Sequence, residues 1–115
     1  MDGSPAVETL LRTVYDGDCA GIAEQLDAHG PELVHARGSD GRRPTHVAAS
    51  ANQPLALALL LNRGADLEGR DANDRTPLHH AIVWHGLDCA GLLLVRGAAV
   101  NALDGEGWTP LHWAW

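Results

Sequence analysis

Apolar residues in the second half of the chain form two short stripes with helical spacing, separated by a break. Ala81 and Ile82 follow Leu78 by three and four residues, which places all three on one face of a helix. The pattern breaks near 85–86, and a second apolar stripe covers 88–94. This arrangement predicts a helix, a turn and a second helix.

The two predicted helices carry signals for where they begin and end. Thr76 can cap the first helix, because its hydroxyl accepts a backbone N–H that has no partner in the first turn. Pro77 suits the first helical position, where no donor is needed. Gly97 is expected to end the second helix in the left-handed conformation. An alternating apolar stretch at 98–103 and the turn DGEG at 104–107 then lead to the next helix start.

These signals return every 33 residues. TPLHHA at 76–81 is followed by TPLHWA at 109–114, and LLLNRGA at 59–65 by LLLVRGA at 92–98. An altered copy, PTHVAA, lies another 33 residues earlier, at 44–49. Agreement at one offset over so many positions indicates an internal repeat.

The 33-residue period, with these hexapeptides and LLLxRGA segments, resembles the ankyrin repeat family. The resemblance implies an all-α solenoid in a single domain, 1–115, in which helix–turn–helix pairs are joined by protruding β-turn loops. The expected units are a degenerate N-terminal capping unit (5–37), two repeats (38–70 and 71–103) and a partial repeat (104–115).

The leading unit, 5–37, departs from the pattern. Ser4–Pro5 has the form of a helix start, and two apolar stripes follow it. One residue more separates Gly30 from Val34 than separates the matching glycine and apolar residue of the next unit. A degenerate terminal unit is expected of a stacked array, because its outer face must meet water.

Unit 38–70 lacks part of the helix-start signal. Arg43 stands where later units have threonine, and Thr45 stands where they have leucine. An arginine side chain cannot accept the N–H that a threonine cap would bond, and a hydroxyl at an apolar position is unfavourable without a partner. We therefore expect that Arg43→Thr combined with Thr45→Leu stabilises the protein, by roughly 1–3 kcal/mol.

The chain ends at Trp115, inside the first helix of the partial repeat. Either the array is cut within a repeat, or a half-repeat covers the open end with its tryptophans. The first interpretation is favoured, because a repeat unit cannot bury its hydrophobic face alone. An open apolar end face would also allow end-to-end self-association.

Composition and charge narrow the classes of function. The chain has 115 residues with 45% hydrophobic content, which suits one domain, and a net charge of −7. An acidic surface repels phosphate backbones and argues against nucleic-acid binding. Neither a signal peptide nor a membrane-spanning run is evident, so we expect a cytoplasmic protein without membrane association. Cys19 and Cys89 lie in units that are separated by a whole repeat, and they have no metal-binding spacing, which predicts two free thiols.

Seven histidines invite a metal or catalytic interpretation, but the repeat explains three of them. His46, His79 and His112 occupy the same position of successive units, and the resemblance implies that their rings hydrogen-bond within and between neighbouring loops. His80 follows His79 directly, and adjacent helical side chains point about 100° apart, so the two do not readily share a metal ion. Zinc-protease, nucleophile-elbow and phosphate-loop motifs are absent as well. We expect no catalytic residue, no metal and no cofactor, and hence no enzyme.

Two classes of function remain. The first is a non-catalytic protein–protein interaction module that binds a protein or peptide on its concave face. The period aligns Arg42, Arg75 and Trp108 in one column, and such a row suits an acidic and partly aromatic ligand. The predicted partner-binding residues are Asp40, Arg42, Asn73, Arg75, His80, Trp84, Glu106, Trp108 and Trp113. The predicted structural framework consists of His46, Thr76, Pro77, His79, Thr109, Pro110 and His112.

The second class is a recruitment segment of a longer enzyme or effector, whose catalytic part would lie beyond the last residue. The sequence does not name the partner, because the repeat fixes the scaffold and leaves the contact residues free. Two tryptophans stay ambiguous. Trp84 fits either a binding surface or the turn between two helices, and Trp108 fits either a binding surface or the open end of the stack.

Overall fold

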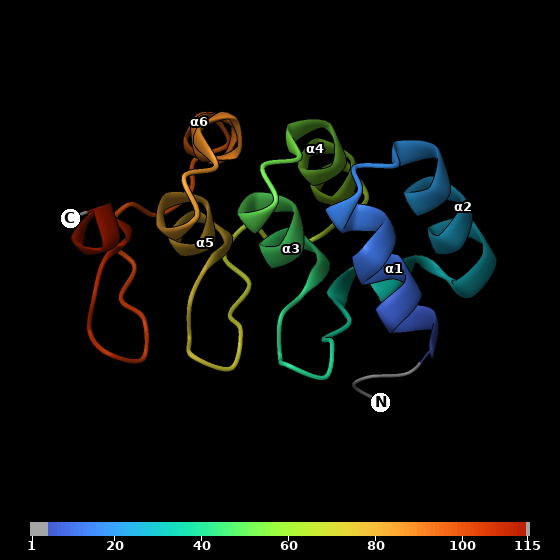
Figure 1. The fold of residues 1–115 in the computed structure, drawn as a ribbon, viewed down its shortest axis with the longest axis horizontal. Helices are drawn as coiled ribbons and strands as arrows, with labels where there is room; N and C mark the ends of the chain where they lie inside the picture. Colours follow the sequence, from blue (N-terminus) through green and yellow to red (C-terminus); the bar gives the residue numbers. More distant parts are fainter. Residues whose placement is uncertain (1–4, 115) are drawn as a thin grey trace.

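Short helices in two rows, with loops that project to one side, make up the protein (Figure 1). The computed structural model describes residues 5–114; the expected helix cap Ser4 and the terminal Trp115 lie outside them. Helices α1, α3 and α5 form one row with the 3-10 helix η2, and α2, α4 and α6 form the other. The bounds are Pro5–Tyr15 (α1), Cys19–His29 (α2), Pro31–His35 (the 3-10 helix η1), Pro44–Ser50 (α3), Pro54–Asn62 (α4), Pro77–Val83 (α5), Leu87–Val95 (α6) and Pro110–Ala114 (η2). No strand occurs among the described residues, and the predicted all-α solenoid is confirmed.

Proline marks where most of these elements begin. All six prolines of the chain are the first residue of a helical element. Proline fits there, because the N–H that it lacks would have no partner in the first turn and its φ is already helical. Gly64 and Gly97 follow α4 and α6 with φ of 98° and 89°, the left-handed conformation that stops a helix. The predicted helix start at Pro77 and the predicted stop at Gly97 are confirmed.

The apolar core lies between the two rows. Ala48, Ala49 and Ala81 are fully buried in α3 and α5, and such small side chains let the rows approach closely. The other helices contribute the large apolar side chains, which sit at the spacing of the sequence stripes. Those that are buried almost completely are Leu10, Val14, Ile22, Leu26, Leu57, Leu60 and Leu93.

The extra residue of the leading unit is accommodated by a tight turn. Gly30, with φ of 98°, ends α2, and η1 follows it at once. This 3-10 turn buries Val34 and packs against α2. The unit therefore keeps its apolar contact although it is one residue longer there than its neighbours.

Aspartate side chains stiffen the loops by accepting hydrogen bonds from the loop backbone. Asp71 and Asp104 each accept, through Oδ1, the N–H groups of the residues two and four positions later, at distances between 2.8 and 3.0 Å. The loop tips, at Gly41, Asp74 and Gly107, all have positive φ. Asp74 is the one tip that adopts this conformation without being glycine, and aspartate tolerates it better than most residues.

Arginine side chains connect the loops across units. Arg37 Nη2 donates to the carbonyl of Arg70 at 3.0 Å, and Arg70 Nη1 donates to the carbonyl of Leu103, 33 residues further on. Arg43 adds two bonds, from Nε to the Arg70 carbonyl at 3.1 Å and from Nη1 to the His35 carbonyl at 2.8 Å. These hydrogen bonds join the segments around residues 35–37, 70 and 103, which connect one unit to the next.

The contacts of Arg43 correct the expectation that this residue is only a defect. Its side chain does not cap α3, as expected, but it joins the end of η1 to the connection after α4. Thr45 is buried, as Leu78 is in the next unit. Replacing Arg43 by threonine would therefore add a cap to α3 but remove two hydrogen bonds that join separate segments.

We predict that Arg43→Thr lowers the free energy of unfolding by about 1–2 kcal/mol. A threonine cap contributes about 1 kcal/mol, whereas each of the two lost bonds from a charged donor contributes about 1.5–3 kcal/mol before a discount for partial exposure. Urea unfolding at neutral pH measures the difference. Arg63→Thr is the matched control, because its bond to Asp27 is an exposed ion pair whose loss should change stability by less than about 1 kcal/mol. An unchanged or raised stability of Arg43→Thr would contradict the role given to the two carbonyl bonds.

Candidate functional site

Histidine rings hold consecutive loops in register. Nδ1 of His46, His79 and His112 accepts the N–H of the residue three positions earlier, at 3.1, 3.0 and 2.9 Å. A ring nitrogen that accepts carries no proton, so the proton of each neutral ring is on Nε2. Nε2 of His46 lies 2.8 Å from the carbonyl oxygen of Arg75. Nε2 of His79 lies 2.9 Å from the carbonyl oxygen of Trp108. Each of these two rings thus donates from one unit to the loop of the next.

The other framework residues lie at the helix starts. Thr76 and Thr109 each accept, through Oγ1, the N–H of the framework histidine of their own unit at 3.4 Å. Pro77 and Pro110 are the first residues of α5 and η2. The structure thus places the predicted framework residues at contacts within and between units.

His80 is buried, which corrects its assignment to the partner-binding set. Only 5% of the residue is exposed, and its Nε2 lies 2.7 Å from Oδ2 of Asp71. In the next unit, Trp113 Nε1 donates to Oδ2 of Asp104 at the same distance. A ring nitrogen nine residues after the aspartate therefore ties the first-row helix to its own loop in both units. That shared spacing is the sequence signal that could have identified the pair.

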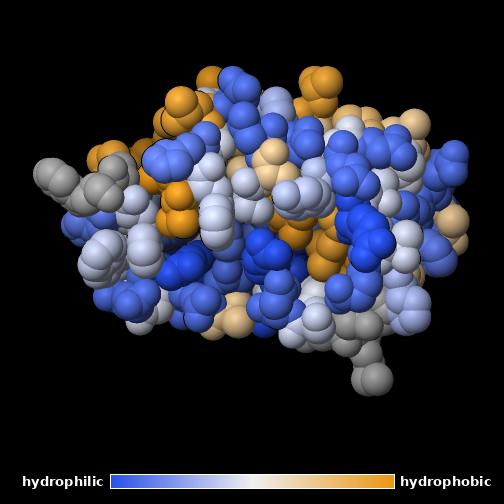
Figure 2. Space-filling model, in the orientation of Figure 1, coloured by the Kyte–Doolittle hydropathy of each residue, from blue (hydrophilic) through white to orange (hydrophobic). Residues whose placement is uncertain are grey.

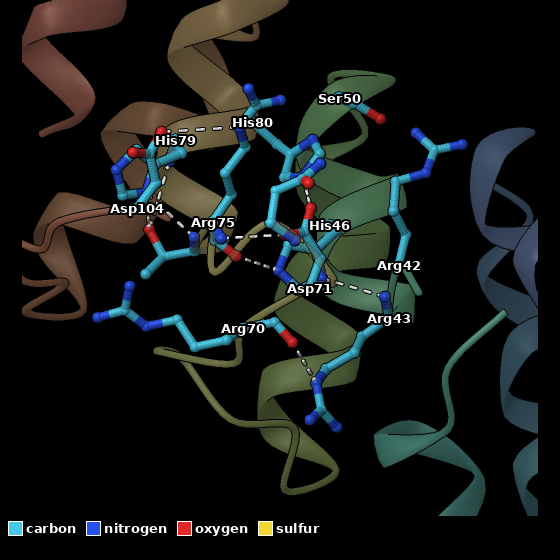
Figure 3. A network of polar contacts seen from close by, with 12 residues as sticks. Arg42, Arg43, His46, Ser50, Arg70, Asp71, Arg75, His79, His80 and Asp104 are labelled. Carbon is cyan, nitrogen blue, oxygen red and sulfur yellow. Dashed lines mark hydrogen bonds and ion pairs between the residues drawn. The ribbon is translucent and has the colours of Figure 1, made fainter. Parts of the chain in front are cut away.

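His46 of α3, His80 of α5 and Asp71 of the loop before α5 form a buried polar cluster (Figure 3). Their ligand-type atoms lie within 4.8 Å of one another, which invites a metal interpretation. However, both nitrogens of His46 are bonded to backbone groups. The Asp71 carboxylate is likewise bonded, to His80 and to two backbone N–H groups. A metal ion would have to displace these bonds, so the cluster fits a support for the loops better than a metal site.

Burial keeps the two rings of this cluster neutral. Burial, together with repulsion from His80, lowers the pKa of His46 to about 4. Burial also lowers the pKa of His80, against the attraction of Asp71. Burial alone would raise the pKa of Asp71, but its hydrogen bonds, first of all that with His80, hold it below its ordinary value. At neutral pH the cluster is a pair of uncharged rings beside an ionised carboxylate.

Arg75 and Trp108 lie in the contact between the last two units. The guanidinium of Arg75 stacks over the ring of Trp113 at 4.5 Å, and its Nη2 lies 3.5 Å from Oε1 of Glu106. Trp108 packs against Trp113 with ring centroids 4.8 Å apart and is 43% exposed. In Figure 3, Arg42 and Arg75 lie on opposite sides of the buried cluster. The predicted column is therefore divided: Arg75 packs against the next unit, and the Trp108 ring packs within its own unit.

The remaining loop residues of the predicted contact set stay exposed. Asn73 and Glu106 lie at exposed loop tips, and the carbonyl of Asn73 accepts the N–H of Gly105 at 2.8 Å. Asp40 Oδ2 accepts from Nε of Arg42 at 2.9 Å, so this ion pair is contained within the first loop.

Two clefts adjoin along the first row of helices. One has a volume of about 230 Å³ and is lined by Tyr15, Arg42, Ser50 and Trp84. The other has the same volume of about 230 Å³ and shares Tyr15 and Arg42 with the first. Because of these shared residues the clefts form one continuous depression, the first-helix groove. The second cleft adds Glu8, Leu11, Arg12, Asp40 and Val47 to its lining.

Three residues of the first-helix groove, Asp40, Arg42 and Trp84, belong to the predicted partner-binding set. Trp84 is 60% exposed, which favours a surface role over covering the turn between α5 and α6. Tyr15 is 62% exposed at the end of α1, and it was not predicted. The degenerate leading unit does not share the period that aligns the other units, and an aromatic residue at the end of its first apolar stripe was the available signal.

The C-terminal end of the stack is apolar. A depression of about 170 Å³ there is lined only by apolar residues: Leu78, Ile82, Leu94, Val100, Pro110 and Leu111. Leu111 is 69% exposed, whereas its counterpart Leu78 is buried. Figure 2 shows hydrophobic side chains gathered over α6 and toward this end. The stacking face of the last unit is therefore uncovered among the described residues.

The two cysteines are free thiols, as predicted. Cys89 is buried, and its Sγ donates to the carbonyl of Ala48 at 3.5 Å. Burial, together with the nearby charge of Asp88, raises the pKa of the Cys89 thiol to about 11. A buried thiol in this state is a poor nucleophile.

Comparison with known proteins identifies the repeat. The family model for ankyrin repeats, in three copies, matches residues 6–104. The matched range includes the degenerate leading unit. No curated protein matches the chain. Within the described residues, every helix is too short or too polar to cross a membrane.

We predict that the protein loses stability between pH 7 and pH 5, before its carboxylates titrate. His46 has a pKa of about 4 when folded and an ordinary value of 6.5, so the unfolded chain binds the proton more readily between these values. The free energy of unfolding therefore has its full value above pH 6.5 and falls as the pH is lowered toward 4. At pH 5 the loss due to His46 is about 2 kcal/mol.

Urea unfolding at several pH values between 7.5 and 5 measures this slope. Asp71 and Asp104 are hydrogen-bonded and have a lowered pKa, so the stabilisation that they contribute is lost only at more acidic pH. His29→Gln, which changes an exposed histidine at the end of α2, is the control and should keep the slope. A free energy of unfolding that stays level from pH 7 to pH 5 would contradict a buried, neutral His46.

Proposed function

Because the chain belongs to the ankyrin repeat family, we propose that it is a non-catalytic module that binds a protein or peptide in the first-helix groove, on the concave side of the array. Ankyrin repeats are in general protein–protein interaction modules. The position of the contact surface and the nature of the partner are our proposal, and the geometry of the groove is what supports them.

The observation that carries the proposal is a pair of exposed aromatic rings in one cleft. Tyr15 and Trp84 are each more than half exposed, and both line the cleft around Arg42. Neither ring belongs to the apolar core, so folding does not explain them. Tyrosine, tryptophan and arginine are the residue types that dominate binding energy at interfaces. The floor of the groove is firm, because Leu11 and Val47 beneath it are buried.

Loop residues would extend this surface toward the last unit. Asn73, Glu106 and Trp108 are exposed in the loops that follow the one carrying Asp40, and we keep them in the proposed contact set. Arg75 contacts Trp113 and the acids of the last loop. We therefore assign Arg75 and Trp113 mainly a supporting role.

The titratable groups support a non-catalytic role. The rings of His46 and His80 are bonded within the scaffold, and Cys89 is buried with a raised pKa. The groove would serve equally as the recruitment surface of a larger enzyme or effector, the alternative class of function. We further propose a cytoplasmic location, which the two free thiols favour.

We predict that Tyr15→Ala and Trp84→Ala each weaken partner binding by roughly tenfold or more, the loss expected at an aromatic hot spot. Peptides selected from a random display library on the wild-type chain serve as partners, and fluorescence anisotropy measures their affinities. Thermal melts should change little, because both rings lie outside the core.

Leu55→Ala provides the matched control. It removes an apolar side chain that is even more exposed, from α4 in the other row of helices, and should leave peptide affinity unchanged. Peptides whose affinity falls with Leu55→Ala but not with Tyr15→Ala or Trp84→Ala would place the contact surface on the second row of helices and contradict the proposal.

The apolar C-terminal end supports a second proposal, end-to-end association of two copies. Two such faces are complementary in chemistry, because the depression on each is lined only by apolar side chains. Sedimentation velocity should show a dimer that grows with concentration, and Leu111→Arg should abolish it by placing a charge in the contact. Leu87→Arg, at an exposed apolar residue of α6 that does not line the depression, should leave the dimer intact. A monomer at every concentration would contradict the proposal.

A further inference from the structure

Two cations of the first-helix groove keep hydrogen-bonding groups free. Arg12, in the last turn of α1, lines the groove. Within residues 5–114, its guanidinium has neither a hydrogen bond nor an ion pair. Arg42 pairs with Asp40 through Nε alone, at 2.9 Å, which leaves both of its Nη atoms for a ligand. A guanidinium group binds a carboxylate best through two parallel bonds.

The two acids of the groove are already bonded. Glu8 Oε2 accepts the N–H of Ser39 at 3.1 Å. Asp40 accepts the N–H and the Nε–H of Arg42 through its two oxygens. Burial alone would raise the pKa of the Asp40 carboxyl, but these bonds hold it below its ordinary value, so the group stays ionised. The two acids and the two arginines of the groove balance in formal charge, but the groups left free to bond include the guanidinium of Arg12 and both Nη atoms of Arg42, although the whole protein carries −7.

Apolar walls and one acceptor complete the cleft around Arg42. Tyr15 and Trp84 offer ring surface on which a ligand side chain can stack. The hydroxyl of Ser50 donates to the carbonyl of Val47 at 3.0 Å, so its oxygen can still accept an N–H from a ligand backbone. A cation, two rings and an acceptor thus face one volume of about 230 Å³.

We propose that the first-helix groove binds an extended acidic peptide segment. In this complex an aspartate or glutamate carboxylate lies against Arg12 and Arg42, and a neighbouring aromatic side chain packs on Tyr15 and Trp84. The inference rests on the proposed function and adds the chemistry of the partner to it.

A single-stranded nucleic acid also offers anions and rings to such a surface, but the charges disfavour it. The groove has two acids beside its two arginines, and a polyanion would place many phosphates near a protein of charge −7. A peptide with one or two carboxylates avoids most of this repulsion.

Peptide display on the full chain tests the inference. Selected peptides should be enriched in aspartate or glutamate next to an aromatic residue. Their affinity, measured by fluorescence anisotropy, should fall roughly tenfold for Arg12→Gln and for Arg42→Gln, as expected when a charge-assisted bond is lost. Arg63→Gln is the matched control, because Arg63 pairs with Asp27 outside the groove, and it should bind as the wild type does. Thermal melts establish that each variant is folded.

A double-mutant cycle tests the contact itself. Changing the peptide's acid to its amide should weaken binding to the wild type by roughly tenfold. The same change should weaken binding to the Arg42→Gln variant distinctly less, because the bond to Arg42 is already absent there and only the contact with Arg12 is left to lose. Arg42→Lys keeps the charge but not the pair of parallel bonds, so it should restore only part of the affinity. Full additivity in the cycle would overturn the assignment of the carboxylate to Arg42.

The outcomes separate this inference from the function on which it rests. Peptides that require Trp84 but show no preference for acids would overturn the acidic ligand and leave the proposed function standing. A library without binders, or binders insensitive to both Tyr15→Ala and Trp84→Ala, would overturn both. An oligothymidylate that binds more tightly than the acidic peptides, with the same dependence on Arg12, would overturn the peptide in favour of a nucleic acid.

Discussion

The hydrogen bond from a histidine ring to the carbonyl of the following loop sets the register of the units that follow the leading one. His46 reaches the carbonyl of Arg75, and His79 reaches that of Trp108. Each accepting carbonyl belongs to the residue directly before a helix-start threonine, so the bond fixes the start of the next first-row helix. The bond requires a neutral ring, because Nδ1 must accept while Nε2 donates, and at His46 burial lowers the pKa and so supplies that state.

The need to bond every buried polar group also explains why many polar side chains of the loops point toward neighbouring segments and not toward solvent. A buried polar group without a partner costs about 1–3 kcal/mol, so groups between stacked loops have to be bonded. Asp71 and Asp104 use one oxygen for their own loop and the other for a ring of the following helix. Arg70 accepts from two arginines and donates to the next connection. The groups left for a partner lie mainly on the first-row helices, where Arg12 and Tyr15 line a groove.

Features set by local helix chemistry were predictable from the sequence, and features set by side-chain contacts between a helix and a loop or another segment were not. The helix starts and the glycine stops follow from local chemistry, so they could be found by their 33-residue spacing. The burial of His80 depends on a carboxylate nine residues earlier, and Arg43 is explained by carbonyls of two other segments. Tyr15 was missed because the leading unit does not share the sequence pattern of the other units, so the period does not indicate that this residue lines a cleft with Arg42.

The net charge of the protein opposes an acidic ligand, whereas the free guanidinium groups of the first-helix groove favour it, and distance decides which effect dominates. Exposed charges are largely screened beyond about 8 Å at physiological ionic strength, so the total of −7 slows the approach of an acid more than it weakens the bound state. Within bonding distance, the orientation of the guanidinium matters most. Asp40 places a negative charge beside the ligand, but its bonds to the N–H and Nε of Arg42 hold that side chain in place. A guanidinium fixed in this way loses less conformational entropy when it binds, which offsets part of the repulsion that Asp40 adds.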